Sequence, residues 1–420
     1  MRFLFVHQNF PGQFLHLVRH LVRAQAHDVV FITEENGNTI PGVRKATYRM
    51  PPSPRPDTHR DAQEFEACMI RAQLVAHVGG TLKSLGFCPD IIIGHHGWGE
   101  LLNMQDVWPG VPLLGYCEFY YNISGFDVNF DPEFPSPAET LPRIRAKNAI
   151  NLLALGNPGH GQTPTLFQHS SYPAWAQEAI TVLPEGVNLD TCRPDPAPRA
   201  AAFGLPGFEV LPGQKLVTYV ARDLEPYRGF HVMMRALPSL LRQCPDAKVL
   251  LVGADGVSYG ARLVDMTWRE WLMREVGPQL DETRVHFCGR LDYETYLRVL
   301  QRSDAHVYLT YPFVASWSLR EALACGCAIV ASDTPPVQEF VSHGESGLLT
   351  PFLEPLTLAC SIASLLEDAA LADRVRGGAR RYAEANLRMD EHLRRYGRLI
   401  DRLTDGQFGS ALGGGAAASP

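Results

Sequence analysis

Short apolar runs bounded by Pro and Gly alternate with longer amphipathic segments along most of the chain. Such runs are typical of strands buried on both faces of a parallel sheet. They predict strands at residues 3–7, 27–33, 90–94, 111–116 and 179–183, and again at 216–220, 248–252, 285–288, 305–308 and 328–331. The amphipathic segments predict helices at residues 13–26, 61–85, 229–243, 293–302, 319–325, 356–366, 370–385 and 389–403. The pattern therefore predicts an α/β protein.

The strands and helices form two series. Single cores stop growing near roughly 250–300 residues, so a chain of this length is expected to form two domains. Each series predicts a doubly wound, Rossmann-like domain, and the two are expected to face one another across a deep cleft. Prolines crowd the segment between the series, which predicts a stiff linker. The predicted parts are a first domain at 1–195, a linker at 196–212, a second domain at 213–387, a helix at 388–405 that crosses back to the first domain, and a disordered tail at 406–420.

The composition is that of an ordinary soluble globular protein, with 45% hydrophobic and 20% charged residues. A net charge of −7 without a basic run argues against nucleic acid as a partner. The nine cysteines show no disulfide or zinc spacing, and the tightest pair, Cys325 and Cys327, is interpreted as small buried residues at a helix end. No apolar run reaches the roughly 18–20 residues that a spanning helix needs. A cytoplasmic protein is expected, with peripheral contact to the inner membrane face as the alternative.

A helix predicted to begin near Ser318 directly follows the end of a strand, and its first turn is a candidate anion site. The first amides of a helix have no intrahelical partner, and together with the positive end of the helix dipole they suit a diphosphate. Ser316 and Ser318 can cap this helix or add hydroxyl donors. Glu321 lies one turn further and could hold two vicinal hydroxyls of a ribose. The alternative is that Glu321 is a solvated residue near a favourable dipole end.

Two arginines share the loop that follows the first strand of the second domain. Arg222 and Arg228 carry guanidinium groups, which match phosphate oxygens in bidentate fashion. The alternative is that they pair with Asp223 or Glu225 at the surface. In the first domain, Gly12 follows the first strand, and its backbone could approach a phosphate closely. Together these positions predict a binding site for a diphosphate.

These segments resemble the glycosyltransferase family 4 pattern, in which two Rossmann-like domains form the GT-B fold. The resemblance covers nearly the whole chain and is strongest between residues 217 and 352. It implies transfer of a sugar from a nucleotide-sugar donor, with UDP-sugar the commoner choice, to an acceptor hydroxyl. It further implies retention at the anomeric carbon without a metal or other cofactor. The acceptor is expected to be a saccharide, a lipid-linked molecule or a small molecule, in the synthesis of a polysaccharide, a lipid-linked glycan or another glycoconjugate.

The resemblance also implies roles for single residues, with two departures from the family pattern. The donor diphosphate is implied to contact Arg222, Arg228 and the amides from Trp317 to Leu319. Glu321 is implied to contact the ribose, and the backbone of Arg290 and Leu291 is implied to contact the base. The family usually has a pair of glutamates eight apart, and the first, which normally faces the donor sugar, falls on Phe313 here (321 − 8 = 313). The basic pair is six apart (228 − 222 = 6), where many members have five and a lysine.

The acceptor is expected against the first domain. His95 and His96 follow the strand at 90–94, and Glu118 follows the strand at 111–116, so all three are expected at the carboxyl edge of the first sheet. His96 and Glu118 are the candidate catalytic residues on this side, because a histidine titrates near working pH and can orient an acceptor hydroxyl. A histidine that is hydrogen-bonded for packing at the strand end is the alternative.

The first helix has an apolar face that includes Leu17 and Leu21 and another face with Arg19 and Arg23. This pattern favours a core-packed helix with a solvated basic side. The alternative is a membrane-surface patch that serves a lipid-linked acceptor.

Two other functions compete with sugar transfer. A nicotinamide-dependent oxidoreductase would carry Gly-x-Gly-x-x-Gly after a strand, and neither the turn at Gly12 nor the one at Gly253 has that spacing. A nucleotide-sugar epimerase or a non-catalytic nucleotide-sugar-binding protein would keep the fold without the transfer, and Phe313 gives that alternative some support.

Overall fold

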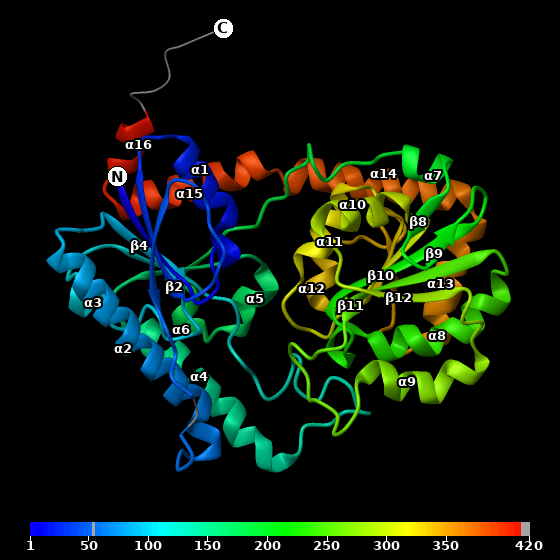
Figure 1. Ribbon diagram of the computed structural model, residues 1–420, viewed down its shortest axis with the longest axis horizontal. Coiled ribbons are helices and arrows are strands. Elements are labelled where there is room, and N and C mark those ends of the chain that lie inside the picture. The colour runs from blue at the N-terminus through cyan, green and yellow to red at the C-terminus, as the bar shows by residue number, and fades with distance from the viewer. Residues whose placement is uncertain (53–54, 413–420) are drawn as a thin grey trace, which may run out of the picture. The chain divides into compact units, whose positions relative to one another are not determined.

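The computed structural model describes residues 1–52 and 55–412. The chain divides into two compact units: unit 1 contains Met1–Glu185 and the described residues from Asp390 onward, and unit 2 contains Gly186–Met389. Each unit is a parallel β-sheet with helices packed on it, as Figure 1 shows. This confirms the prediction of two doubly wound α/β domains.

Unit 1 is built on a seven-stranded sheet of order β3-β2-β1-β4-β5-β6-β7, in which all neighbours run parallel. Its strands are β1 (Arg2–Val6), β2 (Asp28–Glu34), β3 (Val43–Tyr48), β4 (Ile91–His95), β5 (Leu113–Tyr116), β6 (His160–Thr163) and β7 (Ile180–Val182). Its helices are α1 (Leu15–Arg23), α2 (Gln63–Ser84), α3 (Met104–Val107), α4 (Leu141–Gly156), α5 (Leu166–Ser171), α6 (Ala174–Gln177), α15 (Met389–Leu403) and α16 (Gln407–Leu412). The strand order reverses between β1 and β4, and ligands bind such sheets outside the carboxyl ends of the strands at that point.

The two faces of this sheet have separate cores, because successive residues of a strand point to opposite faces. Phe3 and Phe5 of β1 pack with α1, α15 and α16. Leu4 and Val6 of the same strand pack with residues of α2 and α3. The apolar side of α1 is buried in the first of these cores, which confirms the core-packed interpretation of that helix. α15 shares this core with α1 (Figure 1), so the last long helix of the chain packs within unit 1.

Unit 2 is built on a six-stranded parallel sheet of order β12-β11-β10-β13-β14-β15. Its strands are β10 (Lys215–Asp223), β11 (Ala247–Ala254), β12 (Val285–Gly289), β13 (Ala305–Tyr308), β14 (Ile329–Ser332) and β15 (Leu348–Thr350). Its longer helices are α8 (Phe230–Gln243), α9 (Trp268–Val276), α10 (Tyr293–Arg302), α11 (Trp317–Ala324), α13 (Pro355–Glu367) and α14 (Ala369–Asn386), and α12 (Pro335–Gln338) is a single turn. The order reverses between β10 and β13, so the loops that carry Arg228 and Ser316 follow the two strands at the reversal.

Residues 196–212 are not the linker that their proline content predicted. They contain α7 (Ala197–Ala200) and the antiparallel hairpin of β8 (Phe203–Leu205) and β9 (Phe208–Val210). Phe203, Phe208 and Val210 are buried against residues of β10 and β11, so the segment packs into unit 2. Apolar side chains spaced between the prolines gave it a core to join.

The predicted disordered tail also differs in part. Residues 407–412 form α16, because Phe408 packs into the core beneath α15. The rest of the tail, residues 413–420, lies outside the described residues. Among those described, no single helix is both long and apolar enough to cross a membrane. Only α13 and α14 taken together meet that criterion, and they are bent by 99° where they join.

Candidate functional site

Arg228 is a buried cation at the carboxyl edge of the second sheet, with 7% of its surface exposed. It ends the 3-10 turn Pro226–Arg228 that follows β10. Its Nη1 donates to Thr310 Oγ1 at 2.8 Å and to the Val314 carbonyl at 2.9 Å, which fixes it to the segment that leads into α11. Its guanidinium carbon lies 4.9 Å from the centre of the Tyr259 ring. It forms no ion pair with any described carboxylate, although buried charges are normally paired.

Arg222 lies nearby in sequence, at the end of β10, and its side chain is exposed. Within the described parts of the chain, Arg222 has no hydrogen bond or ion pair. The structure therefore does not support the alternative in which these arginines pair with Asp223 or Glu225. Both guanidinium groups keep donors for an anion that comes from outside the chain.

The two acidic residues of this loop are used in other ways. Asp223 Oδ1 lies 3.3 Å from Arg290 Nη2, and Asp223 Oδ2 accepts a short hydrogen bond from the Ser258 hydroxyl. Glu225 is buried and accepts hydrogen bonds from the amides of Ser258 at 3.0 Å and Gly260 at 2.8 Å. Burial raises the pKa of Glu225. These carboxylates hold residues 258–260 against the arginine loop.

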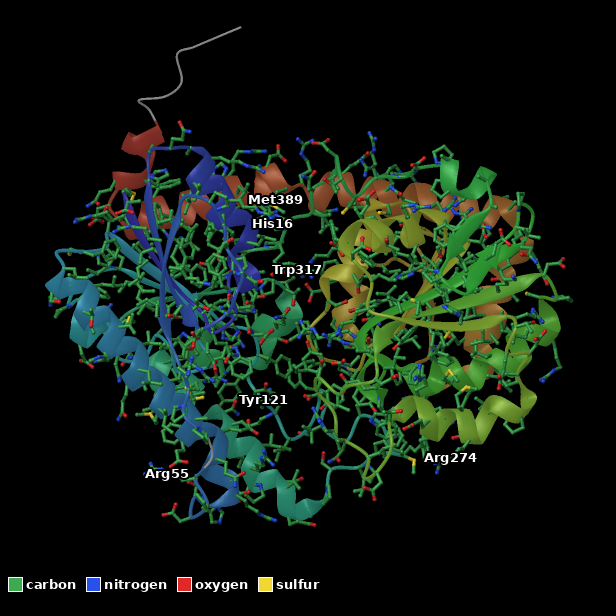
Figure 2. All side chains as sticks on the ribbon, in the orientation of Figure 1. His16, Arg55, Tyr121, Arg274, Trp317 and Met389 are labelled. Atoms are coloured by element: carbon green, nitrogen blue, oxygen red, sulfur yellow. The ribbon has the colours of Figure 1, made fainter. Side chains whose placement is uncertain are left out.

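The first turn of α11 is the place where the sequence predicts an anion site. Ser316 is the residue before the helix and makes no side-chain capping bond to it. Its hydroxyl instead lies 2.6 Å from the Ser318 hydroxyl, and its amide donates to Tyr308 Oη at 2.8 Å. Trp317, labelled in Figure 2, begins the helix, and Leu319 is buried beneath it. The side chain of Ser316 therefore does not cap the first turn of α11.

Glu321 is not the solvated helix residue of the alternative interpretation. Its Oε1 accepts from Tyr293 Oη at 2.9 Å, and its Oε2 accepts from Tyr296 Oη at 2.8 Å. Both tyrosines belong to α10, so two helices hold the carboxylate in place. Burial raises the pKa of Glu321, while the two hydroxyls act in the opposite direction. Each carboxylate oxygen has a second lone pair with which to accept a ligand hydroxyl.

Phe313, which stands where the family pattern usually has a glutamate, belongs to an aromatic cluster. Phe313 is 5% exposed, and its ring centre lies 5.1 Å from that of Tyr259 and 5.8 Å from that of Tyr227. The ring of Tyr311 packs against that of Tyr227 at an angle of 31°, with 4.6 Å between the ring centres. The ring of Phe313 is therefore a packed element of the loop before α11.

Arg290 and Leu291, predicted near the base, follow β12. The Arg290 side chain is largely exposed apart from its contact with Asp223. Leu291 is partly buried against the core that contains Val252 and the β8–β9 hairpin. Their contact with a base stays a prediction.

In unit 1, a cavity of about 200 Å³ opens beside the carboxyl ends of β4 and β5. Among its lining residues are His95 and Glu118, which the sequence placed at this edge. Their side chains approach one another, with His95 Nε2 lying 3.4 Å from Glu118 Oε2. His95 Nδ1 accepts from the Gly97 amide at 3.1 Å, so the neutral ring carries its proton on Nε2. That proton is directed to the Glu118 side.

His96 is not among the residues that line this cavity, and its role as the histidine of the site stays a prediction. It is buried, and a Cβ at Gly115 would come within 2.5 Å of its Nδ1. Burial lowers the pKa of His96 to about 4, so the ring is neutral near pH 7. Side chains at consecutive positions of an extended chain point to opposite faces, which is why His95 reaches the cavity and His96 does not.

Sequence reasoning missed several residues of the cavity, among them Arg71, Trp98 and Lys147. The signal for Arg71 was present, because it interrupts the buried stripe of α2 between Cys68 and Val75. A charged residue on the buried face of a helix is rare without a function or a partner. Trp98 and Lys147 carried no comparable signal.

Gly12 begins the 3-10 turn after β1 with a φ of +54°. A Cβ there would meet the ring of His7 at 3.1 Å, so the turn requires glycine. His7 is buried, and its ring centre lies 5.4 Å from that of His95. Gly12 thus lies at the same sheet edge as the cavity, and its contact with a donor stays a prediction.

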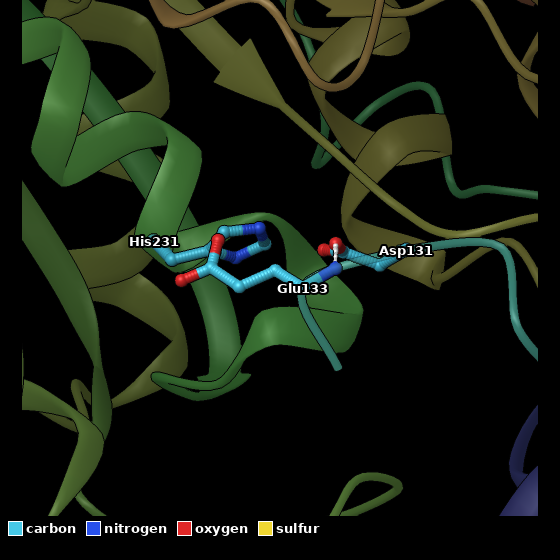
Figure 3. A group of neighbouring side chains, drawn as sticks. All are labelled: Asp131, Glu133 and His231. Atoms are coloured by element: carbon cyan, nitrogen blue, oxygen red, sulfur yellow. Dashed lines mark hydrogen bonds between the residues drawn. The ribbon is translucent and has the colours of Figure 1, made fainter. Parts of the chain in front are cut away.

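The loop that follows β5 contains a turn closed by Asp131 Oδ1, which accepts from the Glu133 amide at 2.9 Å (Figure 3). Asp131 and Glu133 belong to unit 1, whereas His231, the third residue drawn, belongs to unit 2. Neither unit by itself, over its described residues, gathers three His, Cys, Asp or Glu ligand atoms close enough for one metal ion.

Comparison with known proteins agrees with this geometry. The family described as "Glycosyl transferase family 4 group" matches residues 25–192, and "Glycosyl transferases group 1" matches residues 207–382. A phosphatidyl-myo-inositol mannosyltransferase of Mycobacterium leprae is 29% identical over 220 residues, which are 50% of this chain and 52% of that protein. The matched segment therefore spans about half the length of this relative.

Solved structures show the same fold. Sucrose-phosphate synthase from Thermosynechococcus elongatus superposes with a TM-score of 0.73 at 20% identity, covering 97% of this chain and all of that one. The Anabaena HepE protein, solved in complex with UDP and glucose, has a TM-score of 0.68 at 18% identity, covering 96% of this chain and all of its own. With both halves matched by glycosyltransferase families, the chain belongs to the family 4 glycosyltransferases and has the GT-B fold.

Proposed function

We propose that the protein moves a sugar from a UDP-sugar bound in unit 2 to a hydroxyl of an acceptor bound in unit 1. The observation that carries this proposal is Arg228, a buried guanidinium without a carboxylate partner, bonded to the segment that leads into α11. An incoming diphosphate would supply the missing negative charge. The HepE structure with UDP and glucose is consistent with such a donor.

The proposed chemistry is stabilisation of the leaving group. The bond between the anomeric carbon and the diphosphate breaks through an oxocarbenium-like state, and negative charge grows on the departing diphosphate. Arg222, Arg228 and the first amides of α11 would bind that charge, and one such preorganised donor is typically worth about 3–4 kcal/mol. Under this proposal no metal is needed, and the configuration at the anomeric carbon is retained. Glu321 would accept hydrogen bonds from the ribose hydroxyls.

On the acceptor side, we propose that Glu118 accepts a hydrogen bond from the reacting hydroxyl. The oxygen of this hydroxyl bonds to the anomeric carbon, and its proton passes to an oxygen of the departing diphosphate. The Nε2 proton of His95 would hold the Glu118 carboxylate in one orientation, since the two groups lie 3.4 Å apart. The product would be a polysaccharide, a lipid-linked glycan or another glycoconjugate.

The second candidate, an epimerase or a non-catalytic nucleotide-sugar-binding protein, is favoured by one observation. Phe313 lies in an aromatic cluster at the position where the family has a glutamate for the donor sugar. Without that carboxylate, donor binding could continue while transfer is lost.

The test begins with thermal-shift screening of UDP, GDP and ADP, because a ligand that binds the native state raises its stability. Release of UDP from UDP-sugars is then followed together with the sugar product. Transfer or hydrolysis supports a glycosyltransferase, whereas an epimerised sugar, or binding without any turnover, favours the second candidate. No stabilisation by any of the three nucleotides would contradict both.

A further inference from the structure

Arg71 is a second buried guanidinium whose charge no neighbour balances, and it lines the cavity of unit 1. It lies on α2 and is 9% exposed. Its Nη1 donates to the Trp98 carbonyl at 2.9 Å, and its Nε has no hydrogen-bond partner. Across the described residues it forms no ion pair. A ligand in the cavity would therefore meet this guanidinium as a cation without an ion-pair partner.

Glu100 is a buried carboxyl group whose pKa responds to the charge of Arg71, but burial favours its neutral form. Glu100 is fully buried, and its Oε1 accepts from Tyr48 Oη at 2.9 Å. Burial raises the pKa of Glu100 to about 8, so it is mostly protonated at neutral pH. A protonated carboxyl cannot form an ion pair, and the positive charge of Arg71 remains.

The other carboxylates that line the cavity have partners already. Glu64 lies 2.9 Å from Arg143 Nη2 and 3.5 Å from Lys147 Nζ. Glu118 lies 3.4 Å from His95 Nε2. Of the two cationic side chains in the described lining, Lys147 is paired with Glu64, and the guanidinium of Arg71 has no ion-pair partner.

Aromatic side chains form part of the remaining walls. Trp98, Phe119 and Tyr121 line the cavity, and Trp98 is 39% exposed. Tyr121, labelled in Figure 2, lies on the loop after β5 with Lys147 Nζ 4.5 Å from its ring centre. Aromatic faces stack on the C–H faces of a sugar ring. The volume of about 200 Å³ is below the roughly 300–1,000 Å³ of pockets for larger ligands, which favours one ring over a chain of rings.

We infer that the acceptor is a small saccharide that carries one anionic group, a phosphate monoester or a carboxylate, with that group on Arg71 and its ring against Trp98 and Tyr121. The inference rests on the proposed function, since it names the acceptor class for that reaction. Glu118, at the same cavity, would then face a hydroxyl of the same ring. Lipid-linked and polymeric acceptors without a negative charge are not what this cavity is built to hold.

The test is isothermal titration of the full chain with glucose 6-phosphate, glucuronate and glucose. These probes share a ring and differ in charge, and comparison of the first two distinguishes phosphate from carboxylate. We expect at least one anionic sugar to bind, with glucose at least tenfold weaker. Equal binding of glucose and the anionic sugars, or no binding by either anionic sugar at millimolar concentration, would overturn the inference.

Variants locate the site. Arg71→Met is expected to weaken binding of the anionic sugar at least tenfold, and Arg71→Lys is expected to weaken it less. Arg145→Met removes an exposed charge from α4 and is the control, which should leave this binding unchanged. UDP affinity, which depends on unit 2, serves as the fold control. If Arg71→Met does not fold, Arg71→Lys and Trp98→Ala decide, and unchanged affinity in both contradicts the assignment. Anion binding that depends on Arg71 in a protein without transferase activity would refute the proposed function and leave this site standing.

Discussion

Tyr296 donates its hydroxyl to Glu321 Oε2 at 2.8 Å, so the carboxylate predicted to bind ribose is positioned by a residue of another helix. Tyr293 does the same for Oε1 from the preceding turn of α10. A carboxylate fixed at both oxygens loses little freedom when it accepts ligand hydroxyls, which is the benefit of preorganisation. The pair of tyrosines is thus part of the predicted donor site, although neither was identified in the sequence.

We expect Tyr296→Phe to raise the KM for the donor several-fold with kcat little changed, because it loosens a binding group and not a leaving-group contact. The pKa of Glu321 is raised by burial and lowered by the tyrosines, so the variant should also shift the acidic limb of the donor-binding profile to higher pH. Initial rates against donor concentration between pH 5 and 8 measure both effects. A fall in kcat alone, with an unshifted profile, would place Tyr296 outside donor binding.

Arg222→Ala provides the cleanest test of leaving-group stabilisation. Its side chain is exposed and has no partner in the described chain, so removing it should leave the melting temperature within a degree or two of wild type. Turnover should fall roughly a hundredfold if the guanidinium stabilises the departing diphosphate. Arg242→Ala, which removes an exposed arginine from the end of α8, is the matched control and should retain full activity. Equal activity of the two variants would remove Arg222 from the mechanism.

Much of the fold was predictable because buried parallel strands are apolar throughout. Ile91, Ile92 and Ile93 identify β4 without further information. Two of the strands that were missed lack this signal: β6 buries Gln162 and Thr163 between its neighbours, and β3 is an edge strand whose residues are mostly partly exposed or exposed. Packing and ladder hydrogen bonds, which the local sequence does not record, decide such cases.

The candidate site was predictable to the extent that its residues follow strands. Arg228 and Glu118 were found because each lies just past the carboxyl end of an apolar run. Arg71 was not, because it reaches the cavity from the middle of a helix far away in sequence. His95 and His96 could not be distinguished from the sequence. Neighbouring side chains of a strand point to opposite faces, but which of the two points to the cavity is known only once the strand register is known.

His95, the last residue of β4, and His96, which follows it, are expected to differ in their effect on transfer activity. His96→Leu is expected to keep transfer activity within about twofold, because His96 is buried away from the cavity lining. Its pKa of about 4 lies below the ordinary 6.5, so its contribution to stability is full above pH 6.5 and is lost as pH falls toward 4. The variant should therefore lose less stability than wild type between pH 6.5 and 4 in urea unfolding.

His95→Gln is the contrasting variant. The amide keeps a donor near Glu118 but not the ring geometry, and we expect the KM for the acceptor to rise with the donor KM unchanged. If His96→Leu abolished transfer and His95→Gln did not, His96 and not His95 would be the histidine of the site.

Phe313→Glu tests whether the loop before α11 can hold the glutamate that the family usually has at this position. Phe313 is buried among the rings of Tyr227 and Tyr259, so a glutamate there would be desolvated and its pKa raised. A group whose folded-state pKa is raised contributes most below its unfolded pKa and loses that contribution as pH rises. We therefore expect Phe313→Glu to be more destabilised at pH 8 than at pH 5, while Phe313→Leu is destabilised equally at both. Urea unfolding at the two pH values measures this, and a Glu variant as stable as wild type with faster turnover would show that the loop can still accept the family's sugar-binding arrangement.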